Sequence, residues 1–277
     1  MINQKELHKK MMRSGLRATQ IEKDYVLTWL LTGIANDEIL KNCLIFKGGT
    51  CLKKIYFEDY RFSEDLDFTV PKNCEISVKN LLERFSLVFE FVRTQSLNQL
   101  FFDGEIETNS FGTINFNIGY VSVLGGSGSN KGIKVDISID ELLINQPIQK
   151  DLLQTYSDQL DSNLYCYSLE EVLTEKMRAV LQRTRPRDLF DLWYLLEINE
   201  MSIYENYNDF VEKAKHKNLD PSDFLKKVEE KFLTFKKQWD TSMKHQIKDL
   251  PKFDEVVRGL GKHFRLLEKK QILKKLT

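Results

Sequence analysis

Two segments of the chain alternate between apolar and polar or small residues, and this alternation constrains the fold more than any other feature. The first spans residues 114–120 and the second spans residues 133–139. Side chains two positions apart project from the same face of a β-strand, so each segment predicts a strand with one buried face. The sequence therefore requires a sheet in this region and excludes a fold made of helices alone.

The sequence is helical at both ends. Residues 1–40 have a helical pattern, with Thr19 as the expected N-cap of a helix over residues 20–34. From about residue 165 the pattern is helical to the end. No internal repeat and no proline-rich linker separates these regions from the centre of the chain.

Residues 41–145 combine strand and turn signals. The further candidate segments are short strands at residues 45–46 and 66–70 and a glycine-rich hairpin loop at residues 125–132. We therefore expect an α+β fold. In it, residues 1–160 contain a small mixed β-sheet and N-terminal helices, and residues 161–277 form a helical C-terminal domain.

Composition excludes several classes of protein. With 30% charged residues, 5 Pro and 13 Gly in 277 residues, the chain is neither disordered nor collagen-like. Its longest apolar run, residues 25–35, has about half of the roughly 20 residues that a membrane span needs. The polar N-terminus lacks the apolar segment of a signal peptide. The cysteines have no CxxC spacing, so we expect buried thiols in a cytoplasmic protein: Cys43, Cys51, Cys74 and Cys166.

The net charge of zero conceals an uneven distribution of charge. Residues 211–277 contain 18 Lys and Arg against 10 Asp and Glu, a net charge of +8, so residues 1–210 carry −8. A basic segment attached to an acidic body is one electrostatic signature of nucleic-acid binding. Lysine-rich helix faces that contact only water give the same count, so charge alone does not decide between the two.

The tripeptide Asp65-Leu66-Asp67 predicts a site for a divalent cation. At strand spacing its two carboxylates project from the same face and repel each other unless a cation lies between them. Such oxygen ligands suit Mg²⁺ or Mn²⁺. Asp136, on the polar face of the later strand, can add a third carboxylate, and three can hold two metals for phosphoryl transfer. On its own, a DxD tripeptide more often marks a surface turn.

A glycine turn precedes this carboxylate pair. Gly48 and Gly49 follow a predicted strand, and Thr50 opens a predicted helix. Glycines let backbone N–H groups approach a phosphate, and the N-terminus of a helix attracts the same anion. A phosphate-binding turn followed by a metal-binding pair is what nucleoside triphosphate chemistry requires, although two glycines also occur in ordinary tight turns.

A lysine interrupts the apolar face of the first predicted C-terminal helix. Ser168 begins this helix with a capping box. Lys176 lies in the middle of the stripe formed by Leu169, Val172, Leu173 and Val180. Burying an unpaired ammonium is costly. Lys176 therefore needs a triphosphate, Asp136 or Asp188 as its counterion, or must extend past the stripe to solvent.

The next helix is predicted to begin at Pro186, with Asp188 in its first turn, where the positive end of the helix dipole favours an acidic residue. Arg187 and Asp191 have i,i+4 spacing, and a surface salt bridge is the simple interpretation of this pair. The four histidines have no metal-ligand spacing, and we assign them no catalytic role.

These motifs resemble those of the AbiEii/AbiGii-type nucleotidyltransferase toxins, which belong to the polymerase-beta-like nucleotidyltransferase superfamily. The resemblance rests on residues 47–52 and 61–67, on the Arg-Asp-x-x-Asp run at residues 187–191, and on Glu22-Lys23-Asp24-Tyr25. It covers about residues 15–200 and implies the polymerase-beta-like core with a small mixed sheet. The long spacing between the glycine turn and the DxD tripeptide matches the AbiEii-like branch.

The resemblance also implies the site and its chemistry. Carried over by motif, the residues are Gly48, Gly49, Thr50 and Ser63 for the nucleotide, Asp65, Asp67 and Asp136 for metal and catalysis, and Lys176 and Asp188 as further active-site residues, with Lys176 contacting nucleotide. The implied cofactor is Mg²⁺ or Mn²⁺ and the substrate is an NTP. The acceptor would be a tRNA 3′ end or another RNA, and a cognate antitoxin would accompany a toxin of a toxin–antitoxin or phage-defence (abortive infection) system.

Other functions stay open at this point. A DxD glycosyltransferase is also metal-dependent, but it predicts repeated βα units before the DxD tripeptide, and only one glycine turn precedes it here. A non-catalytic or protein-modifying relative, such as an antitoxin-like nucleotidyltransferase, would be favoured by a missing carboxylate, whereas all three carboxylates are present. A small-molecule nucleotidyltransferase would share every motif.

Overall fold

The computed structural model describes residues 2–109, 112–121 and 132–276, with side chains to residue 269, and divides into two compact units. The first unit is Met1–Tyr167 and the second is Ser168–Thr277. The division lies after residue 167 rather than residue 160, because the last strand of the sheet belongs to the first unit. The expected glycine-rich loop at residues 125–132 lies almost wholly outside the described residues.

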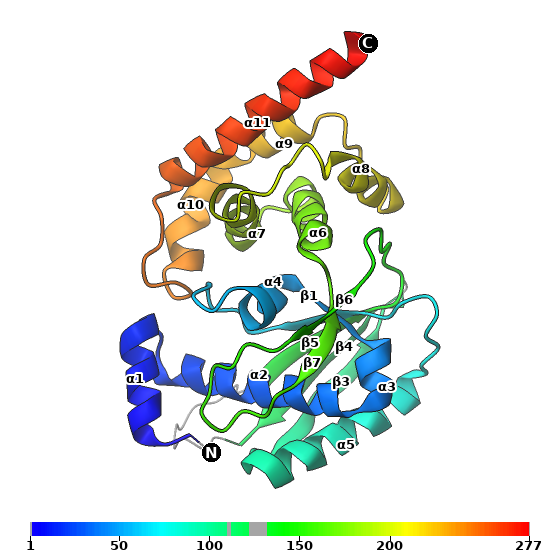
Figure 1. Ribbon diagram of the computed structural model, residues 1–277, viewed down its shortest axis with the longest axis vertical. Coiled ribbons are helices and arrows are strands. Elements are labelled where there is room, and N and C mark those ends of the chain that lie inside the picture. The colour runs from blue at the N-terminus through cyan, green and yellow to red at the C-terminus, as the bar shows by residue number, and fades with distance from the viewer. Residues whose placement is uncertain (1, 110–111, 122–131, 277) are drawn as a thin grey trace. The chain divides into compact units, whose positions relative to one another are not determined.

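A mixed sheet, seven-stranded over the described residues, forms the centre of the first unit, in the order β3-β4-β5-β2-β1-β7-β6 (Figure 1). Its strands are β1 Ile45–Lys47, β2 Leu66–Thr69, β3 Leu100–Thr108, β4 Ile114–Tyr120, β5 Gly132–Ser138, β6 Ile148–Asp151 and β7 Asn163–Cys166. The β2–β5 and β1–β7 pairs are parallel, and the other pairs are antiparallel. The mixed sheet and the α+β class are as predicted.

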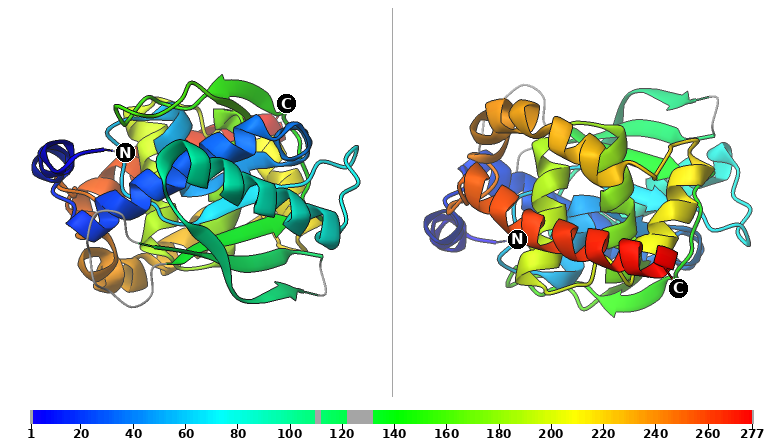
Figure 2. Two further views of the ribbon diagram at one scale, coloured as in Figure 1. Left: turned by 90° about the horizontal axis from the view of Figure 1, so that it is seen from below. Right: turned by 90° about the horizontal axis from the view of Figure 1, so that it is seen from above.

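The first unit also contains helices that pack on the sheet and on one another. They are α1 Gln4–Ser14, α2 Ala18–Asn36, α3 Glu38–Cys43, α4 Gly48–Cys51, the π-helical segment η1 Leu52–Tyr56 and α5 Val78–Ser96. Helices α2 and α5 run side by side over one face of the sheet (Figure 2). Helix α4 and η1 are continuous in the chain and follow directly from β1.

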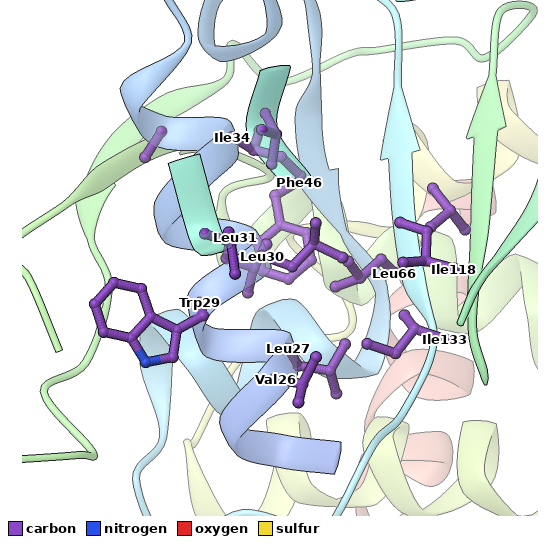
Figure 3. Close-up of a cluster of buried hydrophobic side chains, with 14 of the residues drawn as sticks. Val26, Leu27, Trp29, Leu30, Leu31, Ile34, Phe46, Leu66, Ile118 and Ile133 are labelled. Atoms are coloured by element: carbon purple, nitrogen blue, oxygen red, sulfur yellow. The ribbon is translucent and has the colours of Figure 1, made fainter. Parts of the chain in front are cut away.

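Helix α2 is buried almost all round because it lies between the sheet and other helices. Its side chains Leu27, Leu30 and Ile34 meet Phe46 and Leu66 of the sheet (Figure 3). A helix that is apolar on all sides is one that a core encloses. From this position α2 contacts α1, α3, α5 and strand β7.

The start of α2 differs from the prediction. Arg17 is the N-cap, and the prediction of Thr19 as the cap is wrong, since Thr19 lies inside the helix. The side chain of Gln20, at the third helical position, accepts a hydrogen bond from the backbone N–H of Arg17 at 3.0 Å. This bond satisfies a donor that the helix terminus would otherwise leave unpaired.

The cysteine prediction is also wrong for two residues. Cys43 at the end of α3 and Cys74 before α5 form a disulfide, with a Cα–Cα distance of 5.5 Å. Cys51 and Cys166 are buried and free, as expected. The spacing of the four residues carries no trace of this pairing, because the fold brings together two segments that are 31 residues apart.

The second unit is helical, as the sequence predicts. It consists of α6 Leu169–Gln182, α7 Pro186–Trp193, the π-helical segment η2 Tyr194–Ile198, α8 Tyr207–His216, α9 Phe224–Glu230, α10 Phe232–Met243 and α11 Phe253–Leu276. Ser168 caps α6 by accepting a hydrogen bond from the N–H of Glu171 at 3.2 Å, which confirms the predicted start. Helix α11 packs on α7, η2 and α10.

None of the helices in the described part of the chain combines the length and the apolarity needed to cross a membrane.

Candidate active site

The glycine turn lies between β1 and α4, and its first glycine is required for two reasons. Gly48 has φ of 82°, a left-handed conformation that side chains other than glycine rarely adopt. A Cβ atom at this position would also overlap Oδ2 of Asp67. The backbone of the turn therefore lies directly against a carboxylate of the DxD tripeptide, although the two are far apart in the sequence.

We expect Gly48→Ala to lower the free energy of unfolding by more than strain alone, which is about 1–3 kcal/mol, and to weaken binding of a non-hydrolysable NTP. The matched control is Gly104→Ala. Gly104 has nearly the same φ, 84°, but a Cβ atom there would meet no other atom within 4 Å. Chemical denaturation and calorimetry of both variants separate strain from overlap. Equal losses in the two variants, with NTP binding intact, would contradict the close approach to Asp67.

The second glycine makes room for an arginine that the sequence interpretation left without a role. A Cβ atom at Gly49 would overlap Nη2 of Arg61 and would lie 3.1 Å from Oγ of Ser63. Arg61 is only 1% exposed. Its guanidinium therefore packs against the turn. The only signal for it in the sequence is its place in the same motif as the carboxylates.

Two buried hydroxyls join the turn to the carboxylate segment. The Thr50 hydroxyl donates to the backbone carbonyl of Asp65 at 2.5 Å and lies 2.9 Å from Oγ of Ser63. Thr50 is fully buried and Ser63 is 9% exposed. Their hydroxyls therefore hold the two motifs together from the interior. Gly48, Gly49, Thr50, Ser63 and Asp65 thus form one continuous structure, as their assignment to one site requires.

Asp67 and Asp136 are register partners on the parallel strands β2 and β5. Paired residues on neighbouring strands lie on the same face, about 4.8 Å apart along the hydrogen-bonding direction. The same row continues to Lys47 on β1 and to Asn115 on β4. Lys47, to which the sequence interpretation gave no role, donates from Nζ to Ser138 Oγ at 3.1 Å. The sheet thus has a polar row with two neighbouring carboxylates at its centre.

The two carboxylate oxygens of Asp136 differ in their hydrogen bonding. Its Oδ2 accepts a hydrogen bond from Nζ of Lys134 at 2.6 Å. Its Oδ1 is buried and has no hydrogen-bond partner among the residues that the structure describes. An oxygen of this kind is costly to bury unless a cation or a hydrogen-bond donor completes it.

The protein supplies only some of the ligands that a divalent cation needs. Within residues 2–109, 112–121 and 132–276 no three Asp, Glu, His or Cys side chains converge closely enough to hold a metal by themselves. Mg²⁺, however, commonly takes one or two carboxylates and completes its octahedron with water and substrate phosphates. The adjacent carboxylates of Asp67 and Asp136, with the orphaned Oδ1, provide that number.

In the second unit, Lys176 and Asp188 lie in direct contact. Lys176 Nζ is 3.0 Å from Asp188 Oδ1 and 2.7 Å from Asp191 Oδ2, and Arg183 Nε is 2.7 Å from Asp188 Oδ2. Both aspartates are fully buried. Burial by itself would raise the pKa of Asp188, but Lys176 and Arg183 outweigh it and hold this pKa well below its ordinary value.

This network answers the question of what faces the buried lysine. Of the counterions considered for Lys176, Asp188 is the one it contacts, and Asp191 is a second. Asp191 is buried on α7 beside Asp188, so it does not have the surface position that the simple salt-bridge interpretation gave it. The role of Arg183 is not visible in the sequence, since it depends on how the chain turns between α6 and α7.

Comparison with known proteins is consistent with these motifs. The family model described as "Nucleotidyl transferase AbiEii toxin, Type IV TA system" matches residues 29–259. Among solved structures, the fold is similar to MenT4, a nucleotidyltransferase toxin from Mycobacterium tuberculosis H37Rv. The TM-score is 0.54 and the sequence identity is 17%, over 72% of this chain and 73% of that chain. No curated protein sequence gives a significant match.

Proposed function

Because the chain belongs to the AbiEii nucleotidyl transferase toxin family of type IV toxin–antitoxin systems, we propose that it transfers a nucleoside monophosphate from an NTP to an RNA hydroxyl. As a member of this family the chain is an NTP-dependent nucleotidyltransferase. The proposal concerns the acceptor, which we take to be the 3′ end of a tRNA, the metal, which we take to be Mg²⁺, and the residues that act.

The observation that carries the proposal is the meeting of three separate segments at one face of the sheet. The turn at Gly48 lies against the Asp67 carboxylate, and Asp67 is the register partner of Asp136. A triphosphate held by the turn would therefore lie next to two carboxylates. Asp67 and Asp136 would hold a divalent cation there, with Asp65 as a further predicted ligand, and this cation would supply charge neutralisation for the triphosphate and the transition state.

Groups of the chain itself would then position the triphosphate and deprotonate the acceptor hydroxyl. Backbone N–H groups at Gly49 and Thr50 would bind the β- and γ-phosphates. The acceptor hydroxyl oxygen would form a bond to the α-phosphorus while the bond from that phosphorus to the pyrophosphate oxygen breaks. The hydroxyl proton would pass to the carboxylate of Asp136, acting as general base. The products are the extended RNA and pyrophosphate.

The active-site roles of Lys176 and Asp188 remain predictions. Lys176 would neutralise triphosphate charge, and Asp188 would hold its ammonium in place. Their mutual contact supports the second half of this statement. Removing one partner of these buried ion pairs would also destabilise the second unit, because the other charge would be left buried and uncompensated.

Transfer of label from each of the four α-³²P-labelled NTPs to total tRNA tests the proposal. We expect one or more NTPs to label the tRNA 3′ end, with Mg²⁺ required. Labelling of a copurifying protein instead would favour a protein-modifying relative, and labelling of neither macromolecule with pyrophosphate release intact would favour a small-molecule acceptor. Absence of both products would contradict the proposal. A growth assay with and without a neighbouring antitoxin gene, and with phage challenge, tests the toxin and phage-defence roles in the cell.

Part of the basic charge of the C-terminal region lies along one face of α11. Its exposed or half-exposed basic residues include Arg258, Lys262, Arg265 and Lys269. Their spacing of four, three and four residues aligns them along the helix. The opposite face buries Val256, Leu260, Phe264 and Leu267. A stripe of this kind suits the phosphates of an RNA.

We expect the triple variant Arg258→Gln, Arg265→Gln, Lys269→Gln to reduce the slope of log affinity for tRNA against log salt concentration by about two to three. Each lost cation removes one phosphate contact and its released counterion. The control triple variant carries Gln at Lys9, Lys72 and Lys79, which are exposed in the first unit. Fluorescence anisotropy at several salt concentrations measures both. An unchanged slope in the α11 variant would remove α11 from the RNA interface.

A further inference from the structure

The candidate site consists of two motifs that a long stretch of chain separates. Fifteen residues lie between Gly49 and Asp65. After η1 ends at Tyr56, residues 57–65 belong to no helix or strand. Irregular segments of this length vary readily in conformation unless other groups hold them. The Thr50 hydroxyl and the pairing of Lys47 with Asp67 join the two ends of this stretch directly, and contacts from outside the stretch hold it as well.

One contact of this kind comes from Lys23 on α2. Its Nζ lies 2.8 Å from Oε2 of Glu64, the residue directly before Asp65. The Lys23 side chain is 18% exposed and the Glu64 side chain is 50% exposed. The ion pair thus ties the end of the irregular segment to α2 at the point where the DxD tripeptide begins.

The next residue of α2, Asp24, contacts the other motif. Its Oδ2 lies 2.8 Å from Nζ of Lys54 on η1. Lys54 follows Thr50 by four residues on the continuous helical stretch that begins at the glycine turn. The same ammonium donates to Oγ1 of Thr28 at 2.8 Å, and Tyr156 donates to Oδ2 of Asp24 at 2.8 Å. The helix behind the turn is thereby fixed to α2 by several polar contacts.

This second pair is buried, which is costly and therefore informative. Burial lowers the pKa of Lys54 to about 8, and Asp24 only partly offsets that effect. Apolar residues of similar size would stabilise the same position as well or better, so a buried ion pair is weak evidence for stability. What it provides is a fixed geometry, because the charges tolerate only one arrangement.

We propose that Lys23 and Asp24 are positioning residues for nucleotidyl transfer, which anchor the segment before the metal-binding carboxylates and the helix behind the phosphate-binding turn to the same helix, α2. Consecutive residues of one rigid helix hold the two motifs, Lys23 at the carboxylate end and Asp24 at the turn end. The proposal rests on the proposed function, since it assigns the geometry of that same site. It gives a mechanical role to a segment, Glu22-Lys23-Asp24-Tyr25, whose role the sequence leaves open.

Variants at the two positions test the proposal, with a control on α5 whose partner lies at the C-terminal end of α2. Lys23→Gln removes a partly exposed pair and should leave the unfolding midpoint close to that of wild type. Asp24→Asn should lower it. The control, Arg84→Gln, breaks the ion pair between Arg84 and Asp37, whose Nη2–Oδ2 distance is 2.5 Å, at the far end of α2. Arg84 touches neither motif.

We expect Lys23→Gln and Asp24→Asn to lower kcat/KM for label transfer by about 10- to 100-fold, and Arg84→Gln to stay within about twofold of wild type. Amide hydrogen exchange of residues 48–51, measured without NTP, should accelerate in both α2 variants and not in the control. Charge reversal provides a rescue: Lys23→Glu should be restored by a second change, Glu64→Lys.

Equal kcat/KM and equal exchange in Lys23→Gln and wild type would overturn the proposal, as would failure of the reversed pair to restore activity. If the activity lost by Asp24→Asn were explained entirely by its loss of folded protein, the role of Asp24 would be structural. The proposal would then fail at that residue. Failure of the proposed function has a different outcome, because wild-type protein would then label no acceptor, while the exchange measurement would still report on the turn.

Discussion

Replacing Asp67 with asparagine should reduce nucleotidyl transfer by about 10³-fold or more without unfolding the protein. The reason for the loss is that Asp67 lies at the centre of the polar row, between the glycine turn and Asp136. The amide cannot supply the negative charge that a divalent cation requires. The reason for the retained fold is that Asp67 is half-buried beside another carboxylate, so neutralising it removes a repulsion.

The measurement pairs a transfer assay with thermal unfolding. The matched control is Asp151→Asn, because Asp151 is an exposed aspartate on the edge strand β6 and lies in no part of the site. We expect the control to match wild type in both assays. Transfer by the Asp67→Asn variant at the wild-type rate would show that the two carboxylates do not form the catalytic centre.

Replacing Asp188 with alanine should destabilise the second unit by about 3–5 kcal/mol. The change leaves Lys176 and Arg183 without the carboxylate that both contact, and Lys176 then loses one of its two aspartate partners. The fluorescence of Trp193 and Trp239, both in this unit, reports its unfolding. The control is Asp240→Asn, which breaks an exposed i,i+4 pair with Lys244 and should cost less than about 1 kcal/mol.

The same network predicts how stability depends on pH. The pKa of Asp188 is held well below its ordinary value in the folded protein. A carboxyl with a depressed pKa contributes stability that is complete above its unfolded pKa, near about 3.9, and that is lost as the pH falls through its folded value. The stability difference between wild type and Asp188→Ala should therefore be constant near neutral pH and shrink below about pH 4. A difference that stays constant to lower pH would contradict the assigned ion pairs.

The parts of the fold that the sequence predicts are those whose pattern is set locally. Strands β4 and β5 follow from the alternation that one buried face imposes. The edge strands escaped prediction for the opposite reason. Strand β6 has four exposed residues, and β3 is packed on the core only at Leu100 and Phe102 and is exposed from Asp103 onward, so neither alternates along its whole length. Only pairing with a neighbouring strand defines them.

The candidate site divides in the same way. Its carboxylates and glycines could be predicted because the two motifs follow one another in the chain, although each motif alone has other common explanations. The residues that pack around them could not be predicted. Arg61 is placed by its contact with the turn at Gly49, and Lys47 by its hydrogen bond to Ser138 on another strand. The disulfide of Cys43 and Cys74 was missed for this reason too. Contacts between segments that are far apart in the chain produce no periodic pattern in a single sequence.

The shared metal site of Asp67 and Asp136 is tested most directly by a crystal structure with Mn²⁺ and a non-hydrolysable NTP, with anomalous scattering used to locate the metal. We predict a metal peak within ligand distance of carboxylate oxygens from both residues, with the triphosphate at the Gly48–Gly49 turn. Bound nucleotide with no metal peak between these carboxylates, or an Asp136 side chain directed away from Asp67, would contradict the assignment.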